Sequence, residues 1–309
     1  MKKYVVLCGG VGAARFLEGL VNVVDPESVT AIVNTGDDDE FYGLYVSPDV
    51  DIVIYTLAGV VNKKQGWGFE DETFNCQSIL AKYGHETWFK LGDKDLATHI
   101  HRTYLLKKGY TLAEITDNIR KAWGVKTKII PMTNTFVRTK LITEIGELAF
   151  EEYFVKHKYQ VEVYEVKFEG IENAKPAPGV IEAIEEADGI IIAPSNPIVS
   201  IAPILSVKGI REAIISSKAK KVAISPIVGG RTIKGPADRL LKSLGHEVSA
   251  MGVARLYSDF LDVFIIDSTD AHLKEEIENE LGIEVIVTNT IMKTLEDKKK
   301  LASVVIHKI

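Results

Sequence analysis

The sequence has only two cysteines and no long run of apolar residues. Cys8 and Cys76 are too few for a disulfide framework, so the composition favours a reducing cytoplasm. No stretch approaches the roughly twenty apolar residues that a membrane-spanning helix requires. The start, MKKYVVLCGG, has about five apolar residues before its first glycine. Arg15 and Glu18 follow soon after, so we expect neither a secretion signal nor a membrane anchor.

An excess of positive charge is also missing. The chain carries 37 basic and 43 acidic side chains, for a formal net charge of -6 at pH 7. This balance offers no electrostatic attraction for nucleic acid or an anionic membrane surface, so neither is an expected partner. A nucleophile elbow, a suggestive cysteine and histidine pair and a thiolate metal motif are absent too. We therefore expect no covalent serine or cysteine chemistry, and a phosphate-bearing ligand would need a local site.

Short β-branched apolar runs alternate with helical stretches along most of the 309 residues. Runs of this kind fit strands that are buried on both faces. The alternation predicts an α/β fold with a doubly wound, mainly parallel sheet in a single domain, residues 1–309. The expected strands are Tyr4–Leu7, Val29–Val33, Gly189–Ala193, Lys221–Ile224, Val263–Ile266 and Glu284–Val287, and the expected helices are Ala13–Val24, Ile201–Ser216, Pro236–Leu244, Asp270–Leu281 and Ile291–Val305.

Residues 62–175 interrupt this alternation. Three helical stretches are expected there, followed by two strands near 135–142 and 161–168. We interpret this mostly helical region as an insertion that covers the ligand-binding edge of the sheet. The linker KPAPG, residues 175–179, would return the chain to the core.

Polar and turn-forming residues follow the expected strands. The carboxyl ends of parallel strands share one edge of a sheet, and open α/β sheets bind ligands at that edge. The pattern therefore locates the candidate site before any single residue is interpreted. The segments that carry it are CGGVG, NTGDDD, PSNP, SPIVGG and DSTD.

Three glycines, Gly9, Gly10 and Gly12, follow the first expected strand. They allow backbone N–H groups to approach an anion at the start of a helix, whose dipole favours negative charge. A tight turn without a ligand is one alternative. A dinucleotide site with Asp37 on the ribose is another, although Arg15 stands where its third glycine is expected.

Five aspartates lie close together at Asp37–Asp39, Asp49 and Asp51. Such carboxylates repel one another unless solvent or a cation separates them, and a hard divalent ion such as Mg²⁺ would do so. At least one acid of Asp37–Asp39 is expected to be a solvated loop residue. Because Pro48 starts a turn, we expect Asp51 at a helix start or strand end that faces the ligand.

Charged residues and two histidines fill the segment 88–102. On a helix His99 and His101 would point about 200° apart, so they do not form a two-histidine metal face. We interpret both as surface or packing residues. Lys90, just before the expected helix, is the better candidate to contact an anion or a ligand carbonyl.

Two later turns add further polar groups. Ser195 and Asn196 follow a strand, and Ser200 lies near a helix start whose free N–H groups would suit a second phosphate. A capped turn without a ligand is the alternative. Residues 225–239 repeat the arrangement with glycines, an arginine and a lysine, so the edge as a whole favours a long polyphosphate ligand.

Taken in order, these motifs closely resemble the 2-phospho-L-lactate transferase (CofD) family of coenzyme F-420 biosynthesis. The resemblance runs nearly end to end, and several blocks in the same order are far more specific than any one of them. The blocks are GGVGAARFLEGL, NTGDDDEFYGLYVSPDVD, GWGFEDETFN, KLGDKDLATHIHR, APSNPIVSIAPIL, SPIVGG, GPADRLL and MGVARLYSDFLDVFIID.

The resemblance implies a Rossmann-like core with an inserted region and a transfer reaction. Family members move a phospholactyl or phosphoenolpyruvyl group from a guanosine diphosphate adduct to the terminal ribityl hydroxyl of the deazaflavin Fo, and release GMP with Mg²⁺ present. A cytoplasmic homodimer, as in methanogens, is implied too. The alternatives are a related nucleotide-sugar or nucleotidyl transferase that does not use Fo, and a nucleotide-sugar-binding regulatory protein of the same superfold. Residue types do not distinguish the two donors.

The resemblance also implies roles for single residues. Asp51 and Lys90 match positions that contact Fo, and Asp37 and Asp51 are where we expect the metal ion. Either aspartate is a candidate general base. Asp39 and Glu40 depart from the family, whose members often have apolar or aromatic residues there. The guanosine diphosphate moiety would be bound by Gly9, Gly10, Gly12, Ser195 and Asn196.

Overall fold

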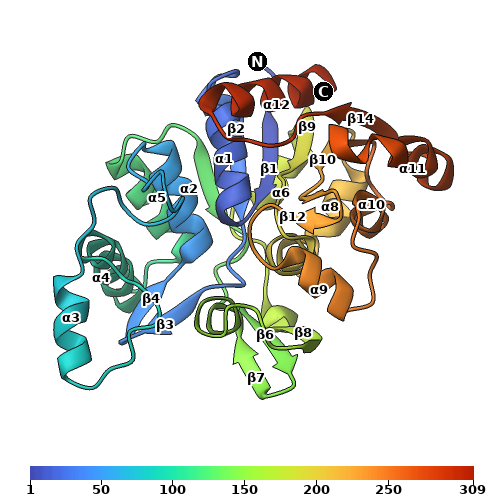
Figure 1. The fold of residues 1–309 in the computed structure, drawn as a ribbon. Coiled ribbons are helices and arrows are strands. Elements are labelled where there is room, and N and C mark those ends of the chain that lie inside the picture. The colour runs from blue at the N-terminus through green and yellow to red at the C-terminus, as the bar shows by residue number, and fades with distance from the viewer.

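A parallel sheet of seven strands forms the centre of the protein in the computed structural model, which describes residues 1–309 (Figure 1). The strands lie in the order β14-β13-β10-β9-β1-β2-β5. Every neighbouring pair is parallel. The strands are β1 (Tyr4–Cys8), β2 (Val29–Val33), β5 (Lys128–Pro131), β9 (Gly189–Ile192), β10 (Lys220–Ile224), β13 (Val263–Asp267) and β14 (Glu284–Thr288).

The sheet separates two apolar cores. Alternate residues of β1 point to opposite faces, so Val5 and Leu7 join one core while Val6 and Cys8 join the other. All five residues of β1 are buried, as expected for a strand that has helices on both faces. The predicted α/β, doubly wound parallel fold is therefore confirmed.

Helices cover both faces of this sheet (Figure 1). The core on one face includes residues of α1 (Gly10–Leu20), α2 (Pro48–Leu57), α5 (Leu112–Ala122) and α12 (Leu295–His307). The core on the other face includes residues of α6 (Val180–Glu185), α7 (Ala202–Ser206), α8 (Ile210–Ser216), α9 (Ala237–Ser243), α10 (Ala250–Tyr257) and α11 (Lys274–Leu281).

Smaller elements lie outside the central sheet. A third, small core of buried Val46, Leu91 and Leu96 packs where a hairpin meets α4. An antiparallel sheet in the order β7-β6-β8 follows later in the chain. These elements are α3 (Asn75–Lys82), α4 (Asp93–Lys107), β3 (Asp39–Phe41), β4 (Leu44–Val46), β6 (Arg138–Thr143), β7 (Gly146–Ala149), β8 (Val163–Glu169), β11 (Ile227–Val228) and β12 (Arg231–Thr232).

The six strands expected from the alternation lie in the central sheet, the two expected near 135–142 and 161–168 are β6 and β8, and the seventh central strand, β5, was not expected. Residues 62–175 were interpreted as an insertion, yet β5 lies within them and pairs with β2. This region therefore consists of α3 to α5 before a core strand and the β7-β6-β8 sheet after it. The helix expected over 201–216 is divided into α7 and α8, because Gly209 between them has a left-handed φ of +100°.

The chain changes direction across the sheet between β1 and β9. After β1 it builds β2 and β5 on one side, and it later returns to build β9, β10, β13 and β14 on the other. The loops that leave β1 and β9 therefore separate at this point, which is where open α/β sheets bind ligands. The backbone N of Gly9, after β1, lies 3.4 Å from Oγ of Ser195, after β9.

None of the helices is both long enough and apolar enough to cross a membrane.

The contact between α1 and α12 offers a test of this packing. A Cβ at Gly19 of α1 would lie 2.4 Å from the backbone C and O of Lys298 in α12. We expect Gly19→Ala to force the helices apart and to lower the free energy of unfolding by about 1–3 kcal/mol, measured by urea denaturation. Exposed Ser303→Ala on α12 is the control. An unchanged urea midpoint for Gly19→Ala would contradict the close packing.

Candidate active site

A cavity of about 740 Å³ opens at the carboxyl edge of the sheet, at the switch between β1 and β9. Every residue that the sequence marks as a candidate lines it. The walls also include aromatic side chains and five cationic ones. The candidate residues are Gly9, Gly10, Gly12, Asp37, Asp51, Lys90, Ser195 and Asn196.

The glycine loop packs directly against neighbouring segments. The N–H of Gly10 donates to Oδ1 of Asp49 at 2.7 Å. A Cβ at Gly9 would lie 2.5 Å from Oδ2 of Asp49, and one at Gly12 would lie 2.3 Å from the carbonyl oxygen of Pro194. These close approaches require glycine even without a ligand. Phosphate binding by the loop stays a prediction, supported by its position at the amino end of α1.

Asp37 and Asp49 share one amide. Nδ2 of Asn34 donates to Oδ2 of Asp37 at 3.2 Å and to Oδ2 of Asp49 at 2.9 Å. The other oxygen of Asp37, Oδ1, is buried and has no hydrogen-bond partner. Glu151, from the segment after β7, lines the same cavity and is also buried. The site therefore holds a buried carboxylate cluster, Asp37, Asp49 and Glu151.

Burial and mutual repulsion favour the protonated forms of these acids. Burial raises the pKa of Asp49 from 3.8 to about 6. Burial, together with the charges of Asp49 and Asp39, raises the pKa of Glu151 from 4.5 to about 8. The pKa of Asp37 lies well above its usual value for the same reasons, burial first and then the charges of Asp49 and Glu151. A bound cation would relieve this repulsion.

The other acids of the triple aspartate have partners of their own. Asp38 accepts hydrogen bonds from the Tyr45 hydroxyl and Oγ of Ser47, both at 2.7 Å. Asp39 pairs with Arg138 of β6. The expectation that one of Asp37–Asp39 is merely solvated is wrong, because all three side chains are buried against other segments.

Asp51 lies in the first turn of α2 and faces the cavity, as expected. Both of its oxygens accept from the guanidinium of Arg102 in α4, Oδ2 from Nη1 at 3.1 Å and Oδ1 from Nη2. Burial raises the pKa of Asp51, while Arg102 and His99 act in the opposite direction. Arg102 is fully buried, so this pair joins α2 to α4 inside the protein.

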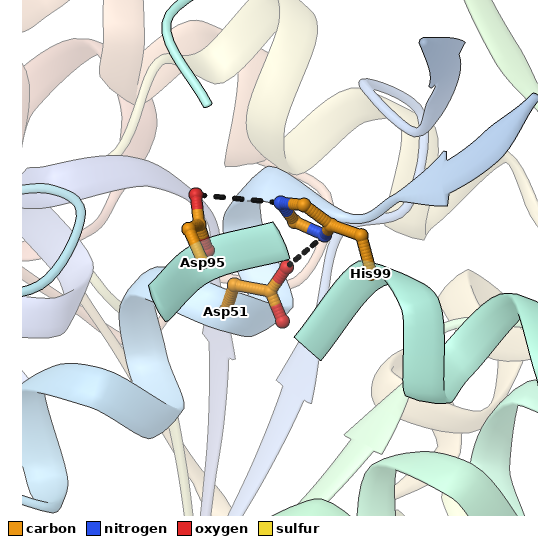
Figure 2. A group of neighbouring side chains, drawn as sticks. All are labelled: Asp51, Asp95 and His99. Carbon is orange, nitrogen blue, oxygen red and sulfur yellow. Dashed lines mark ion pairs between the residues drawn. The ribbon is translucent and has the colours of Figure 1, made fainter. Parts of the chain in front are cut away.

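His99 connects Asp51 to a second acid (Figure 2). Its Nδ1 lies 3.7 Å from Oδ2 of Asp51, and its Nε2 lies 3.3 Å from Oδ2 of Asp95. Burial raises the pKa of Asp95, but contacts with His99 and the Tyr55 hydroxyl outweigh it and leave that pKa below the usual value. His99 is buried, as the packing interpretation allows, and it also lines the cavity, whereas exposed His101 forms a hydrogen bond with Asn118.

The two groups of acids are therefore distinct. Asp37 shares Asn34 with Asp49, while Asp51 shares Arg102 and His99 with Asp95. Ligand atoms of Asp51, Asp95 and His99 lie within 4.8 Å of one another, which suits a metal ion by spacing alone. However, the fixed positive charge of Arg102 already occupies both oxygens of Asp51 and would repel a second cation there.

The remaining candidates differ in their surroundings. Lys90 is exposed and lines the cavity. Oδ1 of Asn196 accepts from the backbone N of Ile198 at 3.0 Å, so Asn196 caps the helical segment Pro197–Ile201. Its Nδ2 is buried without a hydrogen-bond partner. The capped turn is thus present and still leaves a donor at the cavity.

One family model matches almost the whole chain. The family model described as 2-phospho-L-lactate transferase CofD matches residues 4–304. The chain belongs to the CofD family. The resemblance found in its motifs is confirmed.

Curated relatives of this CofD chain carry two names. The 2-phospho-L-lactate transferase of Methanocaldococcus jannaschii is 44% identical over 306 residues, which cover 98% of this chain and 96% of the relative. The phosphoenolpyruvate transferase of Streptomyces griseus is 47% identical over 282 residues, which cover 89% of each. A solved structure of a UPF0052 family member from Bacillus halodurans aligns with a TM-score of 0.68 over 99% of both chains. At 20% identity it supports the fold alone.

The raised pKa values of this CofD chain predict how its stability changes with pH. An acid with a raised folded-state pKa contributes stability at low pH that is lost as the pH rises through that pKa. In EDTA, unfolding free energy should therefore fall between pH 5 and pH 8 as Asp49 and then Glu151 ionise. Glu151→Gln should reduce this fall by about 1 kcal/mol or more, measured by urea unfolding at each pH.

Exposed Glu169→Gln on β8 is the matched control, and its pH dependence should equal that of the wild type. Mg²⁺ should stabilise the wild type more at pH 8 than at pH 5, because the cluster is more ionised there. A Glu151→Gln profile that parallels the wild type would contradict the cluster.

Proposed function

We propose that this chain transfers a 2-phospholactyl or phosphoenolpyruvyl group from its guanosine diphosphate adduct to the terminal ribityl hydroxyl of the deazaflavin Fo. The reaction releases GMP and belongs to coenzyme F-420 biosynthesis. The observation that carries the proposal is the match to the CofD family over residues 4–304. The cavity supports it, because ionisable groups for phosphoryl transfer meet at the switch point of the sheet.

The reaction makes defined demands on the site. The hydroxyl oxygen attacks the phosphorus that carries the three-carbon acid, the bond from that phosphorus to GMP breaks, and the hydroxyl proton leaves. Positioning and charge stabilisation supply most of the catalysis in such transfers. The site must therefore align the hydroxyl with the diphosphate, accept a proton and balance the negative charge of the leaving GMP.

A divalent cation fits the carboxylate cluster. Oδ1 of Asp37 is buried without a partner, and Asp49 and Glu151 lack any paired cation. Oxygen donors of this kind suit Mg²⁺. We retain Asp37 as a metal ligand and place Asp49 beside it in place of Asp51, whose oxygens are held by Arg102. When bound, the ion would neutralise charge on the diphosphate.

Asp51 is then left to act on the Fo hydroxyl. Its carboxylate faces the cavity and is oriented by Arg102, with His99 and Asp95 behind it. We propose that it positions the hydroxyl and accepts its proton as the bond to phosphorus forms.

Binding of the two substrates would use the other candidates. Exposed Lys90 lies at the cavity and is proposed to contact Fo. The guanosine diphosphate moiety is assigned to the amino end of α1, where Gly9, Gly10 and Gly12 lie, and to the turn of Ser195 and Asn196. A homodimer in solution stays a prediction.

Purified protein with Fo, Mg²⁺ and either donor should produce Fo extended by one phospholactyl or phosphoenolpyruvyl group, with one GMP released, as measured by mass spectrometry. Asp51→Asn should lower turnover by about 100-fold or more, because the proton acceptor is lost. Glu40→Gln, which changes an exposed acid of the same motif, is the control and should keep wild-type turnover.

Retained GDP binding would show that Asp51→Asn is folded. Near wild-type turnover of that variant would contradict the role of Asp51. Binding of a UDP-sugar without any transfer to Fo would contradict the proposed reaction itself.

Fo fluorescence tests the role of Lys90 separately. Lys90→Ala should weaken Fo binding by about 10-fold, as loss of a charged hydrogen bond does, and should leave the GDP affinity unchanged. Exposed Lys82→Ala on α3 is the control. The reverse pattern, weaker GDP binding with normal Fo binding, would refute the assignment.

A further inference from the structure

The cavity holds positive charges that the protein does not neutralise. Its cationic side chains form no ion pair with any carboxylate within 4.0 Å, although other cations of the chain form many. The acids of the cavity are deeply buried or interact with Asn34, Arg102 and His99, so they do not form ion pairs with these cations. The unpaired cations are Arg15, Lys90, Lys158, Lys234 and Lys293.

Two of these cations, Arg15 and Lys234, approach the same loop residue. A Cβ at Gly66 would lie 3.6 Å from Nη2 of Arg15 and 3.6 Å from Nζ of Lys234, so both reach the same point of the 62–69 loop. Gly66 has a φ of +78°, which favours glycine and lets the loop approach both side chains. Nζ of Lys234 donates to the carbonyl oxygen of Gln65. The loop thus brings a carbonyl to the pair but no negative charge.

The nearby charge of Arg15 affects the pKa of Lys234. Partial burial and the charge of Arg15 lower the pKa of Lys234. Two like charges kept together beside a cavity cost free energy that a bound anion would recover. Arg15 and Lys234 come from segments more than two hundred residues apart, so the fold itself brings them together.

Arg15 lies on the helix that begins at the glycine loop, so the cationic pair is close to that loop. Arg15 and Val11 are four residues apart in α1 and both contact the position of Gly66, so they share one face of the helix. Side chains lean toward the amino end of a helix, which directs Arg15 back toward the glycine loop. An anion on the pair would therefore belong to the same ligand as a phosphate at that loop.

We propose that Arg15 and Lys234 bind the carboxylate of the three-carbon acid in the donor. This inference rests on the proposed function, which supplies a donor with a diphosphate and one carboxylate. The diphosphate is already provided for by the amino end of α1 and by a cation at Asp37 and Asp49. The carboxylate is the negative group that remains, and a guanidinium binds it through two parallel hydrogen bonds.

The same assignment explains why both donor types suit one site. Lactyl and enolpyruvyl donors differ by a double bond but carry the same carboxylate. A pair that recognises the carboxylate binds either donor, so Arg15 and Lys234 select for the acid group and against plain GDP or GTP as donor.

The test compares two ligands that differ only in the acid group. Arg15→Gln and Lys234→Gln are each expected to weaken binding of the donor in which lactate is joined to the terminal phosphate of GDP by about 10- to 100-fold, with GDP affinity unchanged within about twofold. Isothermal titration calorimetry measures both ligands without turnover. Arg231→Gln is the matched control, since Arg231 is exposed in β12, three residues before Lys234, and does not line the cavity.

Each result has a clear reading. Equal losses for donor and GDP would overturn the proposal and assign the pair to the phosphates. Unchanged donor binding in both variants would also overturn it. Because calorimetry needs no reaction, a wild type that binds the donor but transfers nothing would contradict the proposed function while leaving this comparison intact. Arg15→Lys should recover part of the donor affinity, because it restores charge without the paired hydrogen bonds.

Discussion

The buried carboxylate of Asp49 holds together the three segments on which the site depends. It accepts the N–H of Gly10 at the start of α1 and Nδ2 of Asn34 after β2, while Asp49 itself opens α2. A buried carboxylate without such donors would be strongly unfavourable, so these contacts fix the spacing of the three segments. That spacing leaves no room for a Cβ at Gly9. The glycine motif is thus a packing requirement first, and its place beside the acids follows from it.

Acidic and basic groups without partners of opposite charge share one cavity. Asp37, Asp49 and Glu151 form a buried acidic cluster, while Arg15 and Lys234 form a cationic pair without carboxylates. A ligand that brings the opposite charge would stabilise each set in its ionised form. A metal-bound diphosphate that also carries a carboxylate would satisfy both sets at once. The unpaired acidic and basic groups of the cavity therefore indicate which charges its ligand carries.

The sequence was informative wherever one segment determines the outcome. Apolar runs predict six of the seven strands, and turn residues at their ends place the candidate residues at one edge, where they line the cavity. β5 was missed because it is short and lies among helices. Arg102 and Glu151 were missed as site residues because tertiary packing decides their partners. Arg102 meets Asp51 across 51 positions, and no local pattern marks that distance.

The separation of Asp49 from Asp51 has a simple geometric origin. Residues two apart on an α-helix point about 200° away from each other. Because α2 begins at Pro48, Asp49 and Asp51 must project to opposite sides of its first turn. One side meets Asn34 and Asp37, and the other meets Arg102 and His99. The same rule that separates His99 from His101 thus divides two neighbouring acids between the cluster proposed to bind a cation and the group proposed to receive a proton, so that one short motif would serve both tasks.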